Sequence, residues 1–302
     1  MMIKLEKLST EENNPNSRDI ELQDSLEIVR RINEEDKKVA FCVEKELGSI
    51  SRLIDAILSR YEKETRIIYI GAGTSGRLGI LDASECPPTY GVSFEKVQGI
   101  IAGGNEAIFK AKENAEDKPE LGKQDLLNIN LTENDVVIGL AASGRTPYVL
   151  GAIEYANSIG AITGSITCSK SSDLSKVSQY PIEVPVGAEI VTGSTRMKAG
   201  TAQKMILNMI STTIMIKLGK VFSGYMVDVK TSNQKLIERA KRIIMKTANC
   251  DYEKASDALK KAENDVKTAI VMILLDIDKN MAMEKLNQCD ENVAKIIHEN
   301  LK

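Results

Sequence analysis

Five short apolar runs, separated by stretches with helical spacing, constrain the fold of this chain more than any other feature. The runs are Arg66–Ile70, Val97–Ala102, Asp135–Ala141, Ala161–Thr167 and Pro181–Val186. Apolar runs of this length bounded by turn residues predict buried strands, and their alternation with helices is typical of a parallel sheet. We therefore expect an α/β fold built on a five-stranded parallel sheet.

The segments around these runs predict the helices that cover the sheet. Leu78–Ala83 is expected to begin one helix and Ala107–Ala115 to form another. Ser25–Ile57 carries apolar residues at helical spacing, which indicates two helices packed on the sheet or on a second subunit. Gly200–Leu218 is long, apolar on much of its circumference and rich in methionine, as expected of a core helix.

The last part of the chain has a different character. From about Asn249 the pattern predicts short amphipathic helices with Asp- or Asn-containing breaks that suit helix caps. These helices are expected at Tyr252–Ala262, Val266–Leu275, Met281–Leu286 and Val293–Leu301. The predicted division is an N-terminal helical segment (1–58), a sheet domain (59–247) and a small helical module (248–302).

Composition excludes several functional classes. A formal net charge of −3 over 302 residues provides no basic surface for nucleic acid. Five widely spaced cysteines, odd in number and without a Cys-x-x-Cys pair, argue against a disulfide framework or a zinc site and favour a reducing cytoplasm. The charged N-terminus and the lack of a run of roughly 20 apolar residues predict a protein that is neither secreted nor embedded in a membrane.

Three loops rich in Gly, Ser and Thr predict a binding site for a phosphorylated ligand. They are Gly71–Arg77, Ala142–Pro147 and Thr192–Lys198, and the first two directly follow predicted strands. Glycine lets backbone N–H groups approach an anion, hydroxyls add donors, and a following helix adds its positive dipole end. The candidate contacts are Thr74, Ser75, Ser143, Gly144, Thr146, Ser194 and Thr195, with Arg77, Arg196 and Lys198 nearby. Some of these hydroxyl groups can instead cap helices.

The first loop also matches the dinucleotide fingerprint, as Gly71-x-Gly73-x-x-Gly76. That fingerprint requires an acidic residue at the end of the second strand. Here the second run continues into glycines, and the first acid is Glu106. The hydroxyls of the loop also favour a compact phosphate over a pyrophosphate, so a nucleotide is disfavoured.

Two glutamates are candidates for acid–base chemistry. The only histidine, His298, lies close to the C-terminus, so any proton transfers must fall to Glu and Asp. Glu85 is expected just beyond the first helix beside Pro87-Pro88, where it is either a solvated surface group or an acid or base near the first loop. Glu116 lies in a charged run that is typical of a solvated helix face.

At these residues the chain resembles the sugar isomerase (SIS) domain family, and more closely the N-acetylmuramic acid 6-phosphate etherase family. The matching stretches are Thr10–Ser17, Gly71–Gly91, Ile100–Gly104, Ala142–Pro147, Glu189–Lys204 and Asp265–Leu275. The resemblance implies a three-layer α/β/α sandwich that binds a phosphosugar, and a small UBA-like C-terminal module. It also implies a homodimer with sites near the interface.

The implied activity is removal of the D-lactyl ether from N-acetylmuramic acid 6-phosphate, which gives N-acetylglucosamine 6-phosphate and D-lactate during recycling of cell-wall peptidoglycan. Elimination of lactate from the open-chain aldehyde is followed by addition of water. By position, Glu85 matches the family's proton donor and Glu116 its second active-site carboxylate. No metal or cofactor is implied.

Two departures and two alternatives accompany this resemblance. Broader SIS proteins often have Ser-x-Ser-Gly where this chain has Ala141-Ala142-Ser143-Gly144, so one hydroxyl is absent, which puts isomerase activity in doubt. Asn13 replaces the usual arginine of the N-terminal stretch. A phosphosugar-sensing regulator similar to the glucokinase regulatory protein would bind the sugar and leave it unchanged. An SIS-type aldose–ketose isomerase would convert a phosphosugar without releasing lactate.

Overall fold

The computed structural model describes residues 11–62, 64–110, 112, 114–229, 231 and 233–300. Thr10, Ala111, Glu113 and Leu301, which belong to segments discussed above, lie outside the described residues. The chain forms two compact units. One unit holds the chain up to Ser84 together with Phe94–Ile210, and the other holds Glu85–Ser93 together with the chain from Ser211 onward.

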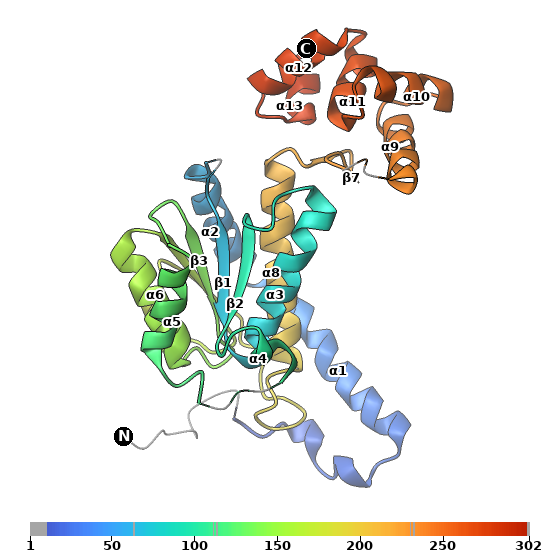
Figure 1. Ribbon diagram of the computed structural model, residues 1–302. Coiled ribbons are helices and arrows are strands. Elements are labelled where there is room, and N and C mark those ends of the chain that lie inside the picture. Colours follow the sequence, from blue (N-terminus) through green and yellow to red (C-terminus); the bar gives the residue numbers. More distant parts are fainter. Residues whose placement is uncertain are drawn as a thin grey trace. The chain divides into compact units, whose positions relative to one another are not determined.

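The first unit is built on the predicted five-stranded parallel sheet (Figure 1). The strands run in the spatial order β2-β1-β3-β4-β5. The last strand differs slightly from its predicted range, Pro181–Val186. It begins one residue earlier, at Tyr180, and ends at Glu183. The strands are β1 (Ile67–Gly71), β2 (Val97–Ile101), β3 (Val136–Leu140), β4 (Ile162–Thr167) and β5 (Tyr180–Glu183).

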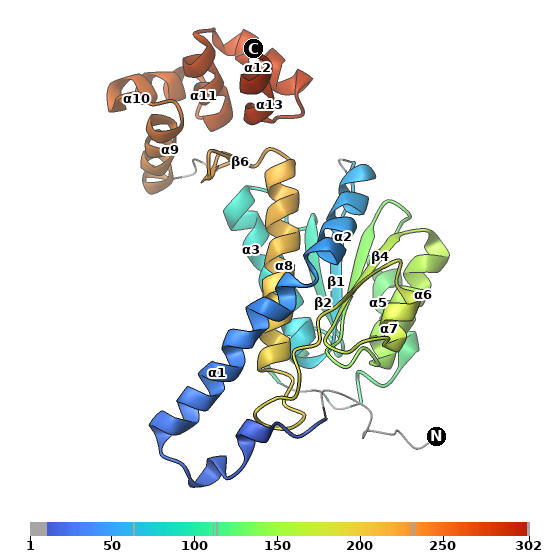
Figure 2. The ribbon, with the colours of Figure 1, turned by 180° about the vertical axis from the view of Figure 1, so that it is seen from behind.

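Helices cover both faces of this sheet, which confirms the expected three-layer sandwich (Figures 1 and 2). Ile68, Ile70 and Val137 lie in one hydrophobic cluster with side chains of α5, α6 and α7. On the opposite face, α2, α3 and the first part of α8 approach the strands, where Gly79 of α3 lies against Tyr69. The first eight helices are α1 (Ser25–Glu44), α2 (Leu47–Ser59), α3 (Gly73–Tyr90), α4 (Glu106–Phe109), α5 (Pro119–Asn128), α6 (Pro147–Ile159), α7 (Asp173–Val177) and α8 (Lys198–Lys217). They belong to the first unit, except that α3 from Glu85 and α8 from Ser211 belong to the second.

The strand order reverses at β1, and this reversal locates the site. From β1 the chain crosses to β2 on one side, whereas β3 lies on the other side of β1. Right-handed crossovers then place the helices that follow β1 and β3 on opposite faces, so their loops diverge and leave a crevice at the carboxyl ends of these two strands. The first two Gly/Ser/Thr-rich loops begin at these strand ends.

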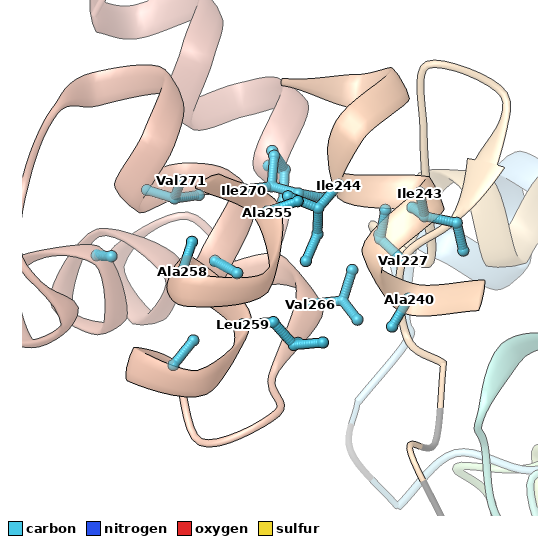
Figure 3. Close-up of a cluster of buried hydrophobic side chains, with 14 of the residues drawn as sticks. Val227, Ala240, Ile243, Ile244, Ala255, Ala258, Leu259, Val266, Ile270 and Val271 are labelled. Carbon is cyan, nitrogen blue, oxygen red and sulfur yellow. The ribbon is translucent and has the colours of Figure 1, made fainter. Parts of the chain in front are cut away.

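The second unit has its own hydrophobic core. A two-stranded hairpin precedes five helices, and side chains of α9, α10 and α11 meet in the cluster around Ile244, Leu259 and Ile270 (Figure 3). Its elements are β6 (Val221–Phe222), β7 (Tyr225–Met226), α9 (Gln234–Thr247), α10 (Tyr252–Lys261), α11 (Val266–Leu275), α12 (Lys279–Gln288) and α13 (Val293–Asn300). The predicted domain limits at residues 58 and 248 stay predictions.

The expected caps in this unit are present. The carboxylates of Asp251, Asp265 and Asp278 each accept a backbone N–H from the first turn of α10, α11 and α12, at 2.8, 2.7 and 3.0 Å. These bonds satisfy donors that a helix cannot satisfy internally. The sequence prediction did not include α9 or the β6–β7 hairpin.

Two helix predictions were wrong. The expected helix Ala107–Ala115 is only the four-residue α4, because Lys110 is extended and Phe109 is 87% exposed, so no apolar face holds a longer helix on the sheet. The first helix does not end at the proline pair: α3 begins at Gly73, inside the first loop, and continues through Pro87 and Pro88 to Tyr90.

Candidate functional site

A cavity of about 440 Å³ opens at the carboxyl ends of β1 and β3, within the first unit. All three Gly/Ser/Thr-rich loops contribute to its wall, as predicted for a single site. Two further segments complete it, one from the N-terminal stretch and one from the connection between α4 and α5. The lining residues are Glu11, Ala72, Gly73, Thr74, Ser75, Glu116, Asp117, Leu140, Ala141, Ala142, Ser143, Arg145, Thr146, Pro147, Gly193 and Thr195.

Most of the predicted contact residues lie in this wall. Thr74, Ser75, Ser143, Thr146 and Thr195 line the cavity. Gly144 and Ser194 do not, although the chain segments around them do.

Gly144 has a packing role in the second loop. Its φ is +66°, and a Cβ atom built on it would lie 2.3 Å from Ser172 Oγ. Its carbonyl accepts the N–H of Leu174, and its own N–H donates to Ala141 O. Only glycine combines this backbone conformation with so close an approach.

The first loop offers backbone donors at the start of a long helix. Gly73 has a φ of +52°, and α3 begins at this residue. Within the described part of the chain, the N–H groups of Gly73, Thr74 and Ser75 have no acceptor, and the helical bonds start with Gly76 N–H, which donates to Ala72 O at 3.1 Å. Three free N–H groups at the positive end of a helix suit a phosphate group.

The hydroxyl of Ser75 also contacts another element of the wall. Ser75 is buried, and its Oγ donates to Gln203 Oε1 of α8 at 2.8 Å. This bond holds the start of α3 against α8. Ser75 therefore offers a ligand its backbone N–H and its remaining lone pairs.

Glu116 lies in the connection between α4 and α5, and its exposed side chain belongs to the cavity wall. Its backbone carbonyl accepts the N–H of Tyr148 in the first turn of α6, at 3.0 Å. The fully buried Tyr148 in turn donates its hydroxyl to Asp125 of α5 at 2.5 Å. Burial, together with the bond to Asp125, raises the pKa of Tyr148. These bonds fix the backbone of Glu116 beside the second loop.

Glu85 lies inside α3, not beyond its end, so the expectation that it occupies a rigid turn was wrong. Its side chain is exposed, and it is not among the residues that line the cavity. Neither Pro87 nor Pro88 can donate a hydrogen bond to the preceding turn. The helix nevertheless continues past both prolines.

The third loop is held by a buried polar cluster that sequence reasoning missed. The carboxylate of Glu189 accepts the N–H groups of Lys198 and Ala199 at 3.0 and 2.9 Å, which caps the start of α8. The ammonium of Lys198 forms an ion pair with Glu35 of α1 at 2.6 Å, and both side chains are less than 5% exposed. No local pattern signals this pair, because 163 positions separate its members.

Glu35 has further donors around it. Burial opposes its ionisation, but hydrogen bonds from Lys198, Lys38 and Asn16 outweigh that effect and lower the pKa of Glu35 to about 2. Glu35 is therefore a carboxylate at neutral pH, and it joins α1 to the end of the third loop.

The N-terminal stretch also contacts this loop. Asn14 donates its side-chain amide to Ala188 O at 2.8 Å, and Asn13 Oδ1 accepts the hydroxyl of Thr192 at 3.0 Å. Asn13, which replaces the arginine expected from the resemblance, thus contacts the protein itself. Glu11 lies in the cavity wall, which adds a third carboxylate beside Glu116 and Asp117.

The cations named from sequence are mostly engaged elsewhere. The guanidinium of Arg77 donates to the carbonyls of Ala107 and Ile108, both at 2.8 Å, and Lys198 is paired with Glu35. Arg196 is not part of the cavity wall. Arg145, which the sequence analysis did not single out, does line the cavity.

Comparison with known proteins agrees with this architecture. The profile of the SIS domain matches residues 115–213, and that of the N-terminal SIS domain of glucokinase regulatory protein matches residues 49–157. The profile of the C-terminal lid domain of glucokinase regulatory protein matches residues 223–286. A phosphoheptose isomerase from Francisella tularensis superposes with a TM-score of 0.50 at 16% identity, covering 64% of this chain and 100% of that one. The sheet, its crevice and these matches define an SIS-domain α/β protein.

The most similar sequences narrow this class. N-acetylmuramic acid 6-phosphate etherase from Clostridium beijerinckii is 56% identical over 98% of both chains. The proteins of the same name from Clostridioides difficile and Bacillus cereus are 54% and 53% identical, over 98% and 97% of this chain and 98% and 100% of their own length. The chain belongs to the N-acetylmuramic acid 6-phosphate etherase family.

Proposed function

We propose that this protein is a carbon–oxygen lyase that cleaves the D-lactyl ether of N-acetylmuramic acid 6-phosphate, with N-acetylglucosamine 6-phosphate and D-lactate as products. The observation that carries this proposal is the identity of 53–56% with etherases over nearly the whole chain. The cavity is consistent with it, since free N–H groups, hydroxyls and carboxylates converge there. The reaction belongs to the recycling of peptidoglycan amino sugars.

The reaction requires two proton transfers before water is added. In the open-chain sugar the aldehyde acidifies the C2 proton, and a base removes it. The C2–H electrons form the C2=C3 double bond, and the C3–O electrons leave on the ether oxygen, which an acid protonates to give D-lactate. Water then adds at C3, and C2 is protonated again. An alkoxide is a poor leaving group, so the acid must be in its protonated form when the ether bond breaks.

We assign these transfers to Glu85 and Glu116. Glu116 is supported by its place in the cavity wall. Glu85 is supported by its match to the family's proton donor, and its side chain on α3 is exposed. Two carboxylates in different surroundings can divide the roles of acid and base.

The decisive experiment measures D-lactate release from N-acetylmuramic acid 6-phosphate by the purified protein. We expect release by the wild type and a loss of about 10²–10⁴-fold in Glu116→Gln and in Glu85→Gln. Glu154→Gln is the matched control, because Glu154 is an exposed carboxylate of α6 outside this cavity. Tight sugar-phosphate binding without any lactate release would refute the lyase and indicate a regulator.

Isotopes in the water test the order of steps. In D₂O the product should carry deuterium at C2, and in H₂¹⁸O it should carry ¹⁸O at C3. Retention of the original oxygen at C3 would contradict elimination followed by hydration. A ketose product without lactate would instead indicate an isomerase.

We also propose that the protein forms a homodimer through α1 and the segment before it. Leu22, Leu26, Val29 and Phe41 are large apolar side chains that are each more than half exposed. Exposed apolar side chains gathered on one element are typical of an interaction surface. Sedimentation of the wild type as a stable monomer at micromolar concentration would refute the dimer.

We place the protein in the cytoplasm. All five cysteines are free thiols, which agrees with a reducing compartment. No helix among the described residues is both long and apolar enough to cross a membrane.

A further inference from the structure

The cavity has an unusual charge balance for a site that receives an anionic sugar. Three carboxylates, from Glu11, Glu116 and Asp117, lie in its wall. Among the described residues of that wall, Arg145 is the one cationic side chain. A substrate with both a phosphate and a carboxylate group would be repelled by these carboxylates unless each of its anionic groups had a partner.

Arg145 is available as the partner of one of these anionic groups. Its side chain is exposed, and within the described part of the chain its guanidinium takes part in no hydrogen bond or ion pair. This distinguishes it from Arg77 and Lys198, whose charged groups are bonded to protein atoms.

The first loop offers a place for the phosphate. The free N–H groups at the start of α3 lie in the first loop, beside the hydroxyl of Thr74. In the second loop two N–H groups are engaged, since Gly144 donates to Ala141 O and Arg145 donates to Ser143 Oγ at 3.4 Å. What the second loop adds is the guanidinium of Arg145, because the guanidinium of the first loop, Arg77, is bonded to backbone carbonyls.

The region beyond Arg145 is more cationic than the cavity itself. Arg145 and Ser143 also line an adjacent cavity of about 340 Å³, whose wall includes Lys170 and Lys176. Lys176 is paired with Asp173, and the two cations Lys170 and Arg145 outnumber the other carboxylate of this wall, Glu12. The wall of this adjacent cavity includes neither Glu116 nor Asp117.

We propose that Arg145 binds the carboxylate of the lactyl group and is the residue that distinguishes the ether substrate from its sugar product. The inference rests on the proposed lyase function. A guanidinium presents two parallel N–H donors that match a carboxylate, and such charge-assisted pairs are strong and directional. N-acetylglucosamine 6-phosphate has the same phosphate but no lactyl carboxylate, so Arg145 adds nothing to its binding affinity.

The test compares two ligands in wild type, Arg145→Ala and Arg145→Lys. KM and kcat are measured for N-acetylmuramic acid 6-phosphate, and Ki is measured for N-acetylglucosamine 6-phosphate as a competitive inhibitor. We expect Arg145→Ala to raise KM about 10- to 100-fold while Ki changes less than about threefold. Arg145→Lys should recover part of the loss, because it keeps the charge without the paired donors.

Equal weakening of both ligands would overturn the proposal, since it would place Arg145 on the shared phosphate or in a structural role. Unchanged KM would overturn it as well. Lys123→Ala is the control, because Lys123 is an exposed cation of α5 outside the cavity wall. Circular dichroism of each variant verifies that the fold is retained.

A lack of lyase activity can be distinguished from a failure of the proposal for Arg145. If the wild type releases no D-lactate, calorimetric Kd values for the same two sugar phosphates replace KM and Ki. A preference for the ether-bearing sugar that disappears in Arg145→Ala would still support carboxylate binding by Arg145. Absence of that preference in the wild type would refute it.

Discussion

Replacement of Glu35 by Gln tests whether the buried ion pair holds the third loop in place. Glu35 and Lys198 are both almost fully buried, and their charged groups are 2.6 Å apart. The substitution keeps the shape of the side chain, and its amide oxygen can still accept the hydrogen bond from Asn16 that Glu35 accepts at 2.7 Å. It removes the negative charge, so the ammonium of Lys198 is left buried beside a neutral group.

The size of the effect follows from these contacts. Removal of one partner of a buried ion pair costs about 3–5 kcal/mol, because the other charge is left uncompensated. The second pair of Glu35, with Lys38, adds little because Lys38 is 54% exposed. The neutral oxygen of Gln still accepts from Lys198 and offsets part of the loss. We therefore expect the free energy of unfolding to fall by about 2–4 kcal/mol.

Urea unfolding followed by circular dichroism measures this change, with the m value checked for constancy. Glu34→Gln is the matched control on the same helix, since Glu34 is exposed, and its effect should stay within about 0.5 kcal/mol. Glu35→Gln/Lys198→Met should recover part of the lost stability, because it removes the uncompensated charge. A loss in Glu35→Gln no larger than in Glu34→Gln would refute the reasoning.

Three further predictions concern stability. Gly144→Ala should destabilise the protein by about 2 kcal/mol or more, because its Cβ would meet Ser172 Oγ and its φ is positive; thermal unfolding measures this, and an unchanged Tm would contradict it. The pKa of Glu35 is lowered to about 2 in the folded state, so its contribution is complete above about pH 5 and is lost as pH falls toward 2; urea titrations between pH 6 and 3 should show a smaller slope with pH in Glu35→Gln, and equal slopes would refute this. Asp265→Ala removes the cap of α11 and should cost about 1 kcal/mol, whereas Asp265→Asn should cost less; equal losses in the two variants would show that the cap bond does not matter.

The strands and the tail helices were predictable because their signals are local. Buried strands appear as apolar runs, and the caps of α10, α11 and α12 appear as Asp residues directly before amphipathic stretches. The extent of α3 could not be read in this way, because Pro87 and Pro88 are ordinary stop signals. The prediction of a helix at Ala107–Ala115 was wrong for the opposite reason. Helical spacing is present there, but the side chain of Phe109 is exposed and packs on no core.

The sequence by itself determined the strands of a parallel sheet and three small-residue loops suited to a phosphorylated ligand. Glycine and hydroxyl side chains after apolar runs mark such loops wherever the chain places them, so this inference needs no tertiary contact. Only the tertiary structure decided which charged groups are available at the site. Arg77 and Lys198 are engaged by carbonyls and by a carboxylate from distant segments, whereas the guanidinium of Arg145 at the cavity wall has no partner among the described residues. Coulomb interactions depend on distance in space, and residues far apart along the chain carry no sequence pattern that shows whether a charge is already paired.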